Sequence, residues 1–131
     1  MTRAARNVGV LSFGTNRRAV PGAIALVEIH PVLNNTKWEE LRLAMYAIEP
    51  PPRWRCMTIT GYYSEADAGW FYHFRSGGYE DIQYVDIFTD SQTNRERIRS
   101  ALKAIHLPGE ETDDGFRVYG YALPGHALNY L

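Results

Sequence analysis

Three consecutive prolines, Pro50 to Pro52, follow a stretch whose spacing is typical of an α-helix. Thr36 and Glu39 fit a capping box, in which the hydroxyl accepts a bond from the N3 amide and the glutamate reaches back to the first residue. Because proline cannot continue a helix, the sequence predicts a helix over residues 36–48. Four apolar side chains of this stretch share one helical face: Trp38, Leu41, Met45 and Ile48.

A second helical stripe lies closer to the end of the chain. Ser91 is a favourable N-cap, and the run Leu107-Pro108-Gly109 ends the pattern. Each predicted helix has a single apolar face, which a sheet or another helix has to cover. The stripe of the second helix is Ile98, Ala101, Leu102 and Ile105.

Segments rich in β-branched and aromatic residues lie between and after the helices, which is typical of strands. We expect strands at residues 53–60, 70–75, 80–88 and 116–121, with a tight hairpin turn at Gly77-Gly78. The acidic residues 110–115 are expected to form a turn before the last strand. The expected order is α-β-β-β-α-β, which is an α+β fold with two helices and a mainly antiparallel sheet of three to five strands.

Residues 1–33 differ from the rest of the chain in composition. They carry four arginines and one glutamate, for a net charge of +3, whereas residues 34–131 carry ten basic and fourteen acidic residues, for −4. We interpret residues 1–33 as an N-terminal extension, which either adds a strand or reflects an upstream start codon. Residues 34–131 are expected to form a single α+β domain that ends, from Ala122 onward, in a loosely packed strap.

Residues 69–88 carry seven aromatic side chains in twenty residues. In a hairpin turned at Gly77-Gly78, alternate residues point to opposite faces. One face would hold Trp70, Tyr72, Phe74, Val85 and Ile87, and the other would hold Phe71, His73, Arg75, Ile82, Tyr84 and Phe88. The helices are expected to cover one of these faces. The other is either covered by residues 1–33 and the tail, or left open to bind a partner.

Several activities lack the motifs that they require. The chain has no phosphate-binding loop, no dinucleotide fingerprint and no nucleophile elbow, and no cofactor is expected. A metal site that joins His106, Glu110 and Asp113 is disfavoured, because such charge runs are usually solvated. The acidic body disfavours nucleic acid as a partner. No apolar run approaches the ~20 residues that cross a bilayer, so we expect a soluble chain, and the single cysteine, Cys56, suits a reducing cytoplasm.

Four segments within residues 34–121 resemble a small bacterial domain family of unknown function: "NNTKWEELRLAMY", "PPRWR", "GWFYHFRSGGYEDIQYVDI" and "IHLPGEETDDGFRVYGY". The resemblance implies a compact α+β domain in the bacterial cytoplasm. Domains of this type are also found among the immunity proteins that neutralise toxins. The resemblance supplies no catalytic residues.

These features favour a cytoplasmic, non-enzymatic protein–protein interaction domain, and a bacterial immunity-type inhibitor of a basic toxin is its most concrete form. The alternative is a small enzyme or ligand-binding domain that uses His73 or His106 in a pocket. A homodimer that closes the open sheet face is compatible with either. The candidate binding residues are Trp70, Phe71, His73, Arg75, Tyr84, Glu110, Glu111, Asp113 and Asp114.

Overall fold

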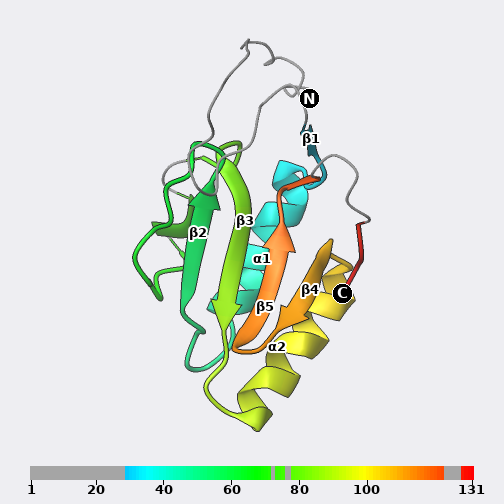
Figure 1. Cartoon of the computed structure of the whole chain (residues 1–131). Coiled ribbons are helices and arrows are strands. Elements are labelled where there is room, and N and C mark those ends of the chain that lie inside the picture. The colour runs from blue at the N-terminus through cyan, green and yellow to red at the C-terminus, as the bar shows by residue number, and fades with distance from the viewer. Residues whose placement is uncertain (1–28, 72, 76–77, 123–127) are drawn as a thin grey trace.

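The computed structural model describes residues 29–71, 73–75, 78–122 and 128–131. Its centre is a four-stranded antiparallel sheet in the order β2-β3-β5-β4 (Figure 1). These strands are β2 (Trp54–Thr58), β3 (Ile82–Phe88), β4 (Gly109–Thr112) and β5 (Gly115–Tyr119). The other elements are α1 (Asn35–Tyr46), α2 (Gln92–Ile105), and a two-stranded sheet of β1 (His30–Pro31) and β6 (Tyr121–Ala122). The predicted α+β fold, with two helices and an antiparallel sheet, is confirmed.

The N-terminal cap of α1 differs from the prediction. Asn34 is the N-cap, and its side-chain oxygen accepts a bond from the Lys37 amide at 2.9 Å. The capping box predicted at Thr36 and Glu39 is therefore wrong, because asparagine is itself a strong cap and starts the helix earlier. The predicted stripe is confirmed, with Trp38, Leu41 and Met45 buried and Ile48 packed at the edge of the core.

The second helix follows the prediction closely. Ser91 Oγ accepts a bond from the Asn94 amide at 3.1 Å, and the predicted stripe packs into the core. The helix ends at His106, whose φ of 65° lies in the left-handed region that usually favours glycine. Lys37 Nζ donates a hydrogen bond to the Ile105 carbonyl at 2.6 Å. A side chain of α1 therefore satisfies a carbonyl at the C-terminal end of α2.

Residues 70–75 do not form the predicted strand. Trp70 and Phe71 lie in a turn and His73–Arg75 form a short 3₁₀-helix, η3, while β3 pairs with β2 on one side and β5 on the other. The predicted hairpin between residues 70–75 and 80–88 is wrong for the same reason. Trp70 and Phe74 are four residues apart, and this spacing fits one face of a helical turn as well as one face of a strand. Tyr72, Ser76 and Gly77 lie outside the described residues.

The aromatic segment instead contributes mainly to the core. Trp70, Phe74 and Tyr79 pack with Trp38 and Trp54, and neighbouring ring centroids lie 4.7–5.9 Å apart. We call these five side chains the aromatic cluster. Among the described residues, the buried Trp54 indole N–H has no hydrogen-bond acceptor, and the Trp54 ring meets Phe74 edge to face at 84°. Edge-to-face contacts of this kind stabilise pairs of aromatic rings.

The two helices cover one face of the four-stranded sheet, and Figure 1 shows α1 behind it. The row Cys56, Val85 and Val118 faces these helices and is buried. Ile82 joins the same core, although simple alternation predicted the opposite face. A register shift opposite Met57 and Thr58 inserts an extra residue into β3 and turns Ile82 inward.

β4 is a strand that the sequence did not predict. Its residues Glu110 and Glu111 were expected to form one acidic turn with Asp113 and Asp114, but only the two aspartates occupy the turn to β5. Glutamate has a low intrinsic preference for strands. The pairing with β5 and the arginines of α2 described below outweigh that preference here.

Both outer edges of the sheet are partly covered. Beside β2, Trp54 pairs with Asp67 and Met57 pairs with Tyr63. Beside β4, the Gly109 amide donates to the Asn129 carbonyl at 2.9 Å. Covered edges offer few free backbone groups to a strand from another chain.

The ends of the chain are described only in part. Residues 1–28 and 123–127 lie outside the described residues. The prediction that the N-terminal segment and the tail cover a sheet face therefore concerns residues that are mostly not described. β1 does pair with β6, so the last residues of the predicted extension contain a short strand. In the predicted strap, the Leu131 amide donates to the Leu107 carbonyl and the Leu131 side chain packs against the core. The division at residue 34 stays a prediction.

Candidate functional site

The structure distributes the nine predicted binding residues over separate places. Trp70 lies in the aromatic cluster, Phe71 and His73 lie on the surface, Tyr84 and Glu110 lie on the sheet face away from the helices, and Glu111, Asp113 and Asp114 lie at the β4–β5 hairpin. The side chain of Arg75 is outside the described part of the chain. Trp70 is 1% exposed and donates its indole N–H to the Pro52 carbonyl. The burial of Trp70 in this structure therefore does not support a direct contact with a partner, and its role in binding stays a prediction.

Phe71 belongs to an apolar surface patch. Its ring lies 5.2 Å from the ring of Tyr46, and Leu43 precedes Tyr46 by one turn of α1. These three residues, which we call the Phe71 patch, are 40–51% exposed and make up three of the five large hydrophobic side chains that the described residues expose. Leu43 and Tyr46 were missed. The available signal was their apolar character on the otherwise polar side of the predicted helix.

A buried arginine fixes the backbone beneath this patch. Arg42, whose side chain is 5% exposed, donates from Nη1 to the Phe71 carbonyl at 2.6 Å and from Nη2 to Glu39 Oε1 at 2.7 Å. Glu39 also accepts the Tyr79 hydroxyl at 2.5 Å. The bond to Glu39 raises the pKa of Arg42, and burial raises the pKa of Tyr79. Arg42 was missed, although a charged residue four positions after Trp38 in an apolar stripe indicates a buried ion pair.

The two candidate histidines lie in exposed positions on different elements. His73 Nδ1 lies 3.0 Å from Asp67 Oδ2, and the His73 side chain is 69% exposed. Burial raises the pKa of Asp67, but the Gly69 amide and His73 together bring it below its ordinary value. His106 is exposed and stacks on Tyr130 with ring centroids 4.8 Å apart. Both histidines are exposed, so their positions do not support the alternative of an enzyme or ligand-binding domain that uses a histidine in a pocket.

Two other kinds of chemistry can be assessed from geometry. Among the residues that the structure describes, no group of three or more His, Cys, Asp or Glu side chains is placed to hold a metal ion. Cys56 is buried, and burial together with Asp86 raises the pKa of its thiol to about 12. Because the thiolate is the reactive form, Cys56 is a poor nucleophile at neutral pH.

No helix of the described residues covers the other side of the sheet, which we call the helix-free face. Its centre is Asp86, which accepts Arg117 Nε at 2.7 Å, Arg117 Nη2 at 3.1 Å and the Tyr63 hydroxyl at 2.6 Å. The bond to Asp86 raises the pKa of Arg117, and burial raises the pKa of Tyr63. Asp86 is almost fully buried, and these three bonds reach its two carboxylate oxygens.

Guanidinium groups stack on the tyrosines of the helix-free face. Arg117 lies 3.9 Å from the centroid of the Tyr84 ring, and Arg55 lies 4.0 Å from that of Tyr63. Of this surface only Tyr84 and Glu110 were predicted. The others were missed because the predicted hairpin gave β3 the wrong neighbour and so concealed the pairing with β5.

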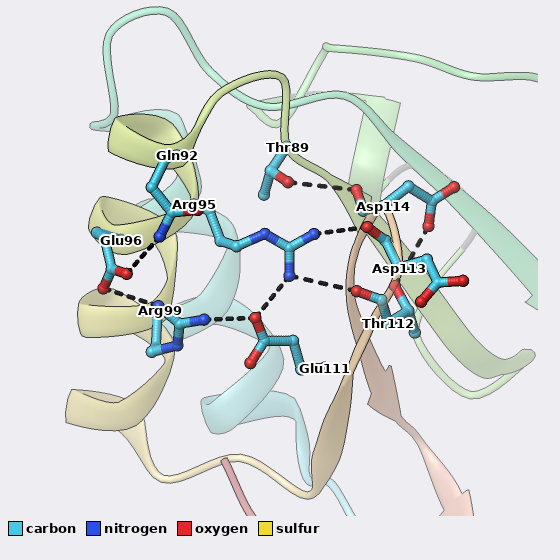
Figure 2. Close-up of polar contacts among 9 residues, drawn as sticks. All are labelled: Thr89, Gln92, Arg95, Glu96, Arg99, Glu111, Thr112, Asp113 and Asp114. Carbon is cyan, nitrogen blue, oxygen red and sulfur yellow. Dashed lines mark hydrogen bonds and ion pairs between the residues drawn. The ribbon is translucent and has the colours of Figure 1, made fainter.

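The acidic hairpin is bound to α2 by arginines, as Figure 2 shows. Arg95 Nη1 donates to Glu111 Oε2 at 2.5 Å, Arg95 Nη2 donates to the Asp113 carbonyl at 2.8 Å, and Arg99 also contacts Glu111. The bond to Arg95 lowers the pKa of Glu111. Glu111 therefore has a structural role, whereas the carboxylates of Asp113 and Asp114 remain exposed at the turn.

The surface of the described residues is strongly acidic. Eleven carboxylates are exposed: Glu40, Glu49, Glu65, Glu80, Asp81, Asp90, Glu96, Glu110, Glu111, Asp113 and Asp114. The exposed lysines and arginines of the same part of the chain are three: Arg53, Arg97 and Lys103. Most other basic side chains are half-buried against acidic or aromatic partners, so carboxylates predominate among the exposed charged groups of the described residues.

Within the described residues, no helix has the length and apolar character needed to span a membrane.

Comparison with known proteins gives a family and no function. The chain matches no curated protein and no solved structure. The model of a family of unknown function, DUF6678, matches residues 22–125, which include α1, the four-stranded sheet and α2. The chain therefore belongs to DUF6678, a family of unknown function, as the resemblance of its motifs predicted.

Proposed function

We propose that this chain is a non-enzymatic protein-binding domain that contacts its partner through the Phe71 patch. The observation that carries this proposal is the grouping of exposed Leu43, Tyr46 and Phe71 at the end of α1. Neighbouring exposed apolar side chains mark protein interaction sites more often than isolated ones do. Aromatic side chains supply much of the binding energy at such sites.

The contacts beneath the patch favour tight binding. The Phe71 carbonyl is bonded to Arg42, which Glu39 and Tyr79 hold in turn. A surface fixed in this way loses little conformational freedom when a partner arrives. The guanidinium of Arg42 also lies 5.1 Å from the Phe71 ring centroid, which limits the motion of the ring itself.

The partner that fits this surface is a basic protein. Eleven exposed carboxylates against three exposed lysines and arginines would accelerate the approach of a positively charged molecule. A bacterial immunity-type inhibitor that neutralises a basic toxin in the cytoplasm is the most concrete form of this role. The lone cysteine, kept as a buried thiol, is compatible with that location.

Affinity capture with the full chain, from a lysate of the source organism, tests the proposal. The Phe71→Ala variant keeps the backbone bond to Arg42 and removes only the exposed ring. We expect it to weaken the Kd of the captured partner by about 30-fold, which corresponds to the loss of about 2 kcal/mol at an interface hot spot. Tyr62→Ala is the matched control, because Tyr62 is 62% exposed outside the patch.

Salt and charge variants test the chemistry of the partner. Replacing Asp113 and Asp114 with asparagine should lower the association rate at low salt and reduce its salt dependence. Glu111 is left unchanged, because its pairs with Arg95 and Arg99 hold the hairpin. A partner whose Kd is the same for the wild type and for Phe71→Ala, with both chains folded, would contradict the proposal.

A further inference from the structure

We infer that the helix-free face binds a second copy of this chain, in a two-fold symmetric dimer that packs the two sheets face to face. The helix-free face is separate from the Phe71 patch, so the dimer stands independently of the proposed function. The order of charges across the sheet carries the inference, and the composition of the face supports it.

One row of side chains crosses all four strands of the helix-free face. The register pairs Arg55 of β2 with Asp86 of β3, Asp86 with Arg117 of β5, and Arg117 with Glu110 of β4. Directly paired residues of neighbouring antiparallel strands point to the same face. The row therefore alternates positive, negative, positive and negative, at a spacing of about 4.8 Å per strand.

This alternation is self-complementary in one orientation only. If the two-fold axis runs along the row, each side chain faces its own copy and like charges meet. If the axis runs along the strands, between β3 and β5, the row of the second copy is reversed. Arg55 then faces the second copy's Glu110, and Asp86 faces the second copy's Arg117. Opposite charges therefore meet at both ends of the row, and no like charges face each other at its centre, where Asp86 and Arg117 are already paired within each copy.

The residues at the two ends of the row retain hydrogen-bonding capacity for these contacts. Arg55 Nε donates to the Ser64 carbonyl at 2.6 Å, while its two terminal amino groups have no acceptor among the described residues. Glu110 is exposed, and in the same part of the chain only its Oε2 accepts a bond, from the Tyr119 hydroxyl at 3.0 Å. Symmetry gives the dimer two Arg55–Glu110 pairs, one at each end of the row.

The rest of the helix-free face has the composition of an association surface. Tyr84 and Tyr119 lie next to the row and meet edge to face with ring centroids 6.2 Å apart. Tyrosine and arginine are enriched among the residues that dominate binding energy. Because both edges of the sheet are partly covered, this face is the surface through which two sheets can associate.

Sedimentation equilibrium of the full chain tests the dimer. We expect a monomer–dimer equilibrium at concentrations below about 1 mM, shifted toward monomer by salt because the end pairs are exposed. The variants Arg55→Glu and Glu110→Arg each place like charges opposite each other at both ends of the row. Each should therefore be monomeric where the wild type is dimeric. Lys103→Glu makes the same change of charge on α2 and should leave the equilibrium unaltered.

An equimolar mixture of Arg55→Glu and Glu110→Arg is the decisive measurement. In a mixed pair, one end joins the two unaltered residues and the other end joins the two substituted residues, so opposite charges meet at both ends. The mixture should dimerise although each variant alone does not, with circular dichroism confirming that both are folded. A wild type that stays monomeric throughout would overturn the inference and leave the face to another occupant, such as residues 1–28. A mixture that stays monomeric while the wild type dimerises would overturn it as well, because the dimer would then use another surface.

Discussion

Arg42 is the residue whose replacement most sharply tests how the Phe71 patch is held. Arg42→Met keeps a side chain of similar length and removes the bonds to Glu39 and to the Phe71 carbonyl. The lost charge-assisted bond to the carbonyl is worth about 1.5–3 kcal/mol. Glu39 is 35% exposed, so water solvates the carboxylate that is left behind. We therefore expect the free energy of unfolding to fall by about 2–3 kcal/mol.

Replacing Glu39, the other partner of this ion pair, should lower the free energy of unfolding by more than replacing Arg42 does. This difference between the two variants is the signature of a buried arginine paired with a partly exposed glutamate. Glu39→Met leaves the guanidinium of Arg42, which is only 5% exposed, without its counter-charge. An uncompensated buried charge costs about 3–5 kcal/mol. The double variant removes both charges and should cost at least about 1 kcal/mol less than the sum of the two single changes.

Urea unfolding at neutral pH measures all four members of this cycle, with a constant m-value as evidence of two-state behaviour. Arg97→Met is the control, because Arg97 is exposed on α2 and makes one bond to the Glu49 carbonyl. It should change stability by no more than about 0.5 kcal/mol. Additive costs for Arg42 and Glu39, or a smaller cost for Glu39→Met than for Arg42→Met, would refute the reasoning.

Three further predictions concern stability and reactivity. The pKa of Glu111 lies below its ordinary value of 4.5, so the stabilisation that ionised Glu111 provides is present above that pH and is lost as the pH falls through the lowered pKa. Glu111→Gln should therefore reduce the fall in the free energy of urea unfolding at acid pH. Native Cys56 should react with a disulfide reagent at pH 8 at least about 100-fold more slowly than in urea, and equal rates would disprove its burial. Gly115→Ala places Cβ 1.8 Å from the Ile87 carbonyl oxygen and should cost at least about 3 kcal/mol in urea unfolding; unchanged stability would contradict the close approach of β3 and β5.

The helices could be predicted because their signals are local. The stripes that begin at Trp38 and Ile98 follow from residues within one element, and so does the Ser91 cap. The error at Asn34 is local as well. Asn34 and Thr36 are both residue types that favour the N-cap position. The difference in capping preference between asparagine and threonine is too small to decide from sequence alone where the helix begins.

The sheet could be predicted only in part, because strand pairing is a long-range property. Residues 70–75 carry apolar side chains at a spacing that suits a strand or a helical turn, and only the pairing of β3 with β5 excludes the strand. β4 was missed because acidic residues seldom form strands on their own. Its stability depends on Arg95 and Arg99, which belong to a helix that precedes it in the chain.

The candidate binding surfaces also combine features that could be predicted from local sequence with features that could not. Phe71 and Tyr84 could be identified as aromatic side chains in a favourable segment, but their neighbours could not. Tyr46 reaches Phe71 across 25 positions of sequence, and Arg117 reaches Tyr84 from a different strand. Which side chains share a surface depends on the fold, so the composition of a site cannot be known before the topology.

The aromatic cluster has a practical consequence for spectroscopy. All three tryptophans of the chain, Trp38, Trp54 and Trp70, belong to it, so the intrinsic emission of the protein reports on one small volume beside α1. Fluorescence will detect the loss of Arg42 readily. An opening of the β4–β5 hairpin away from α2 would break the bonds of Arg95 to the Glu111 carboxylate and the Thr112 carbonyl, which lie outside the aromatic cluster, so the emission is not expected to report it.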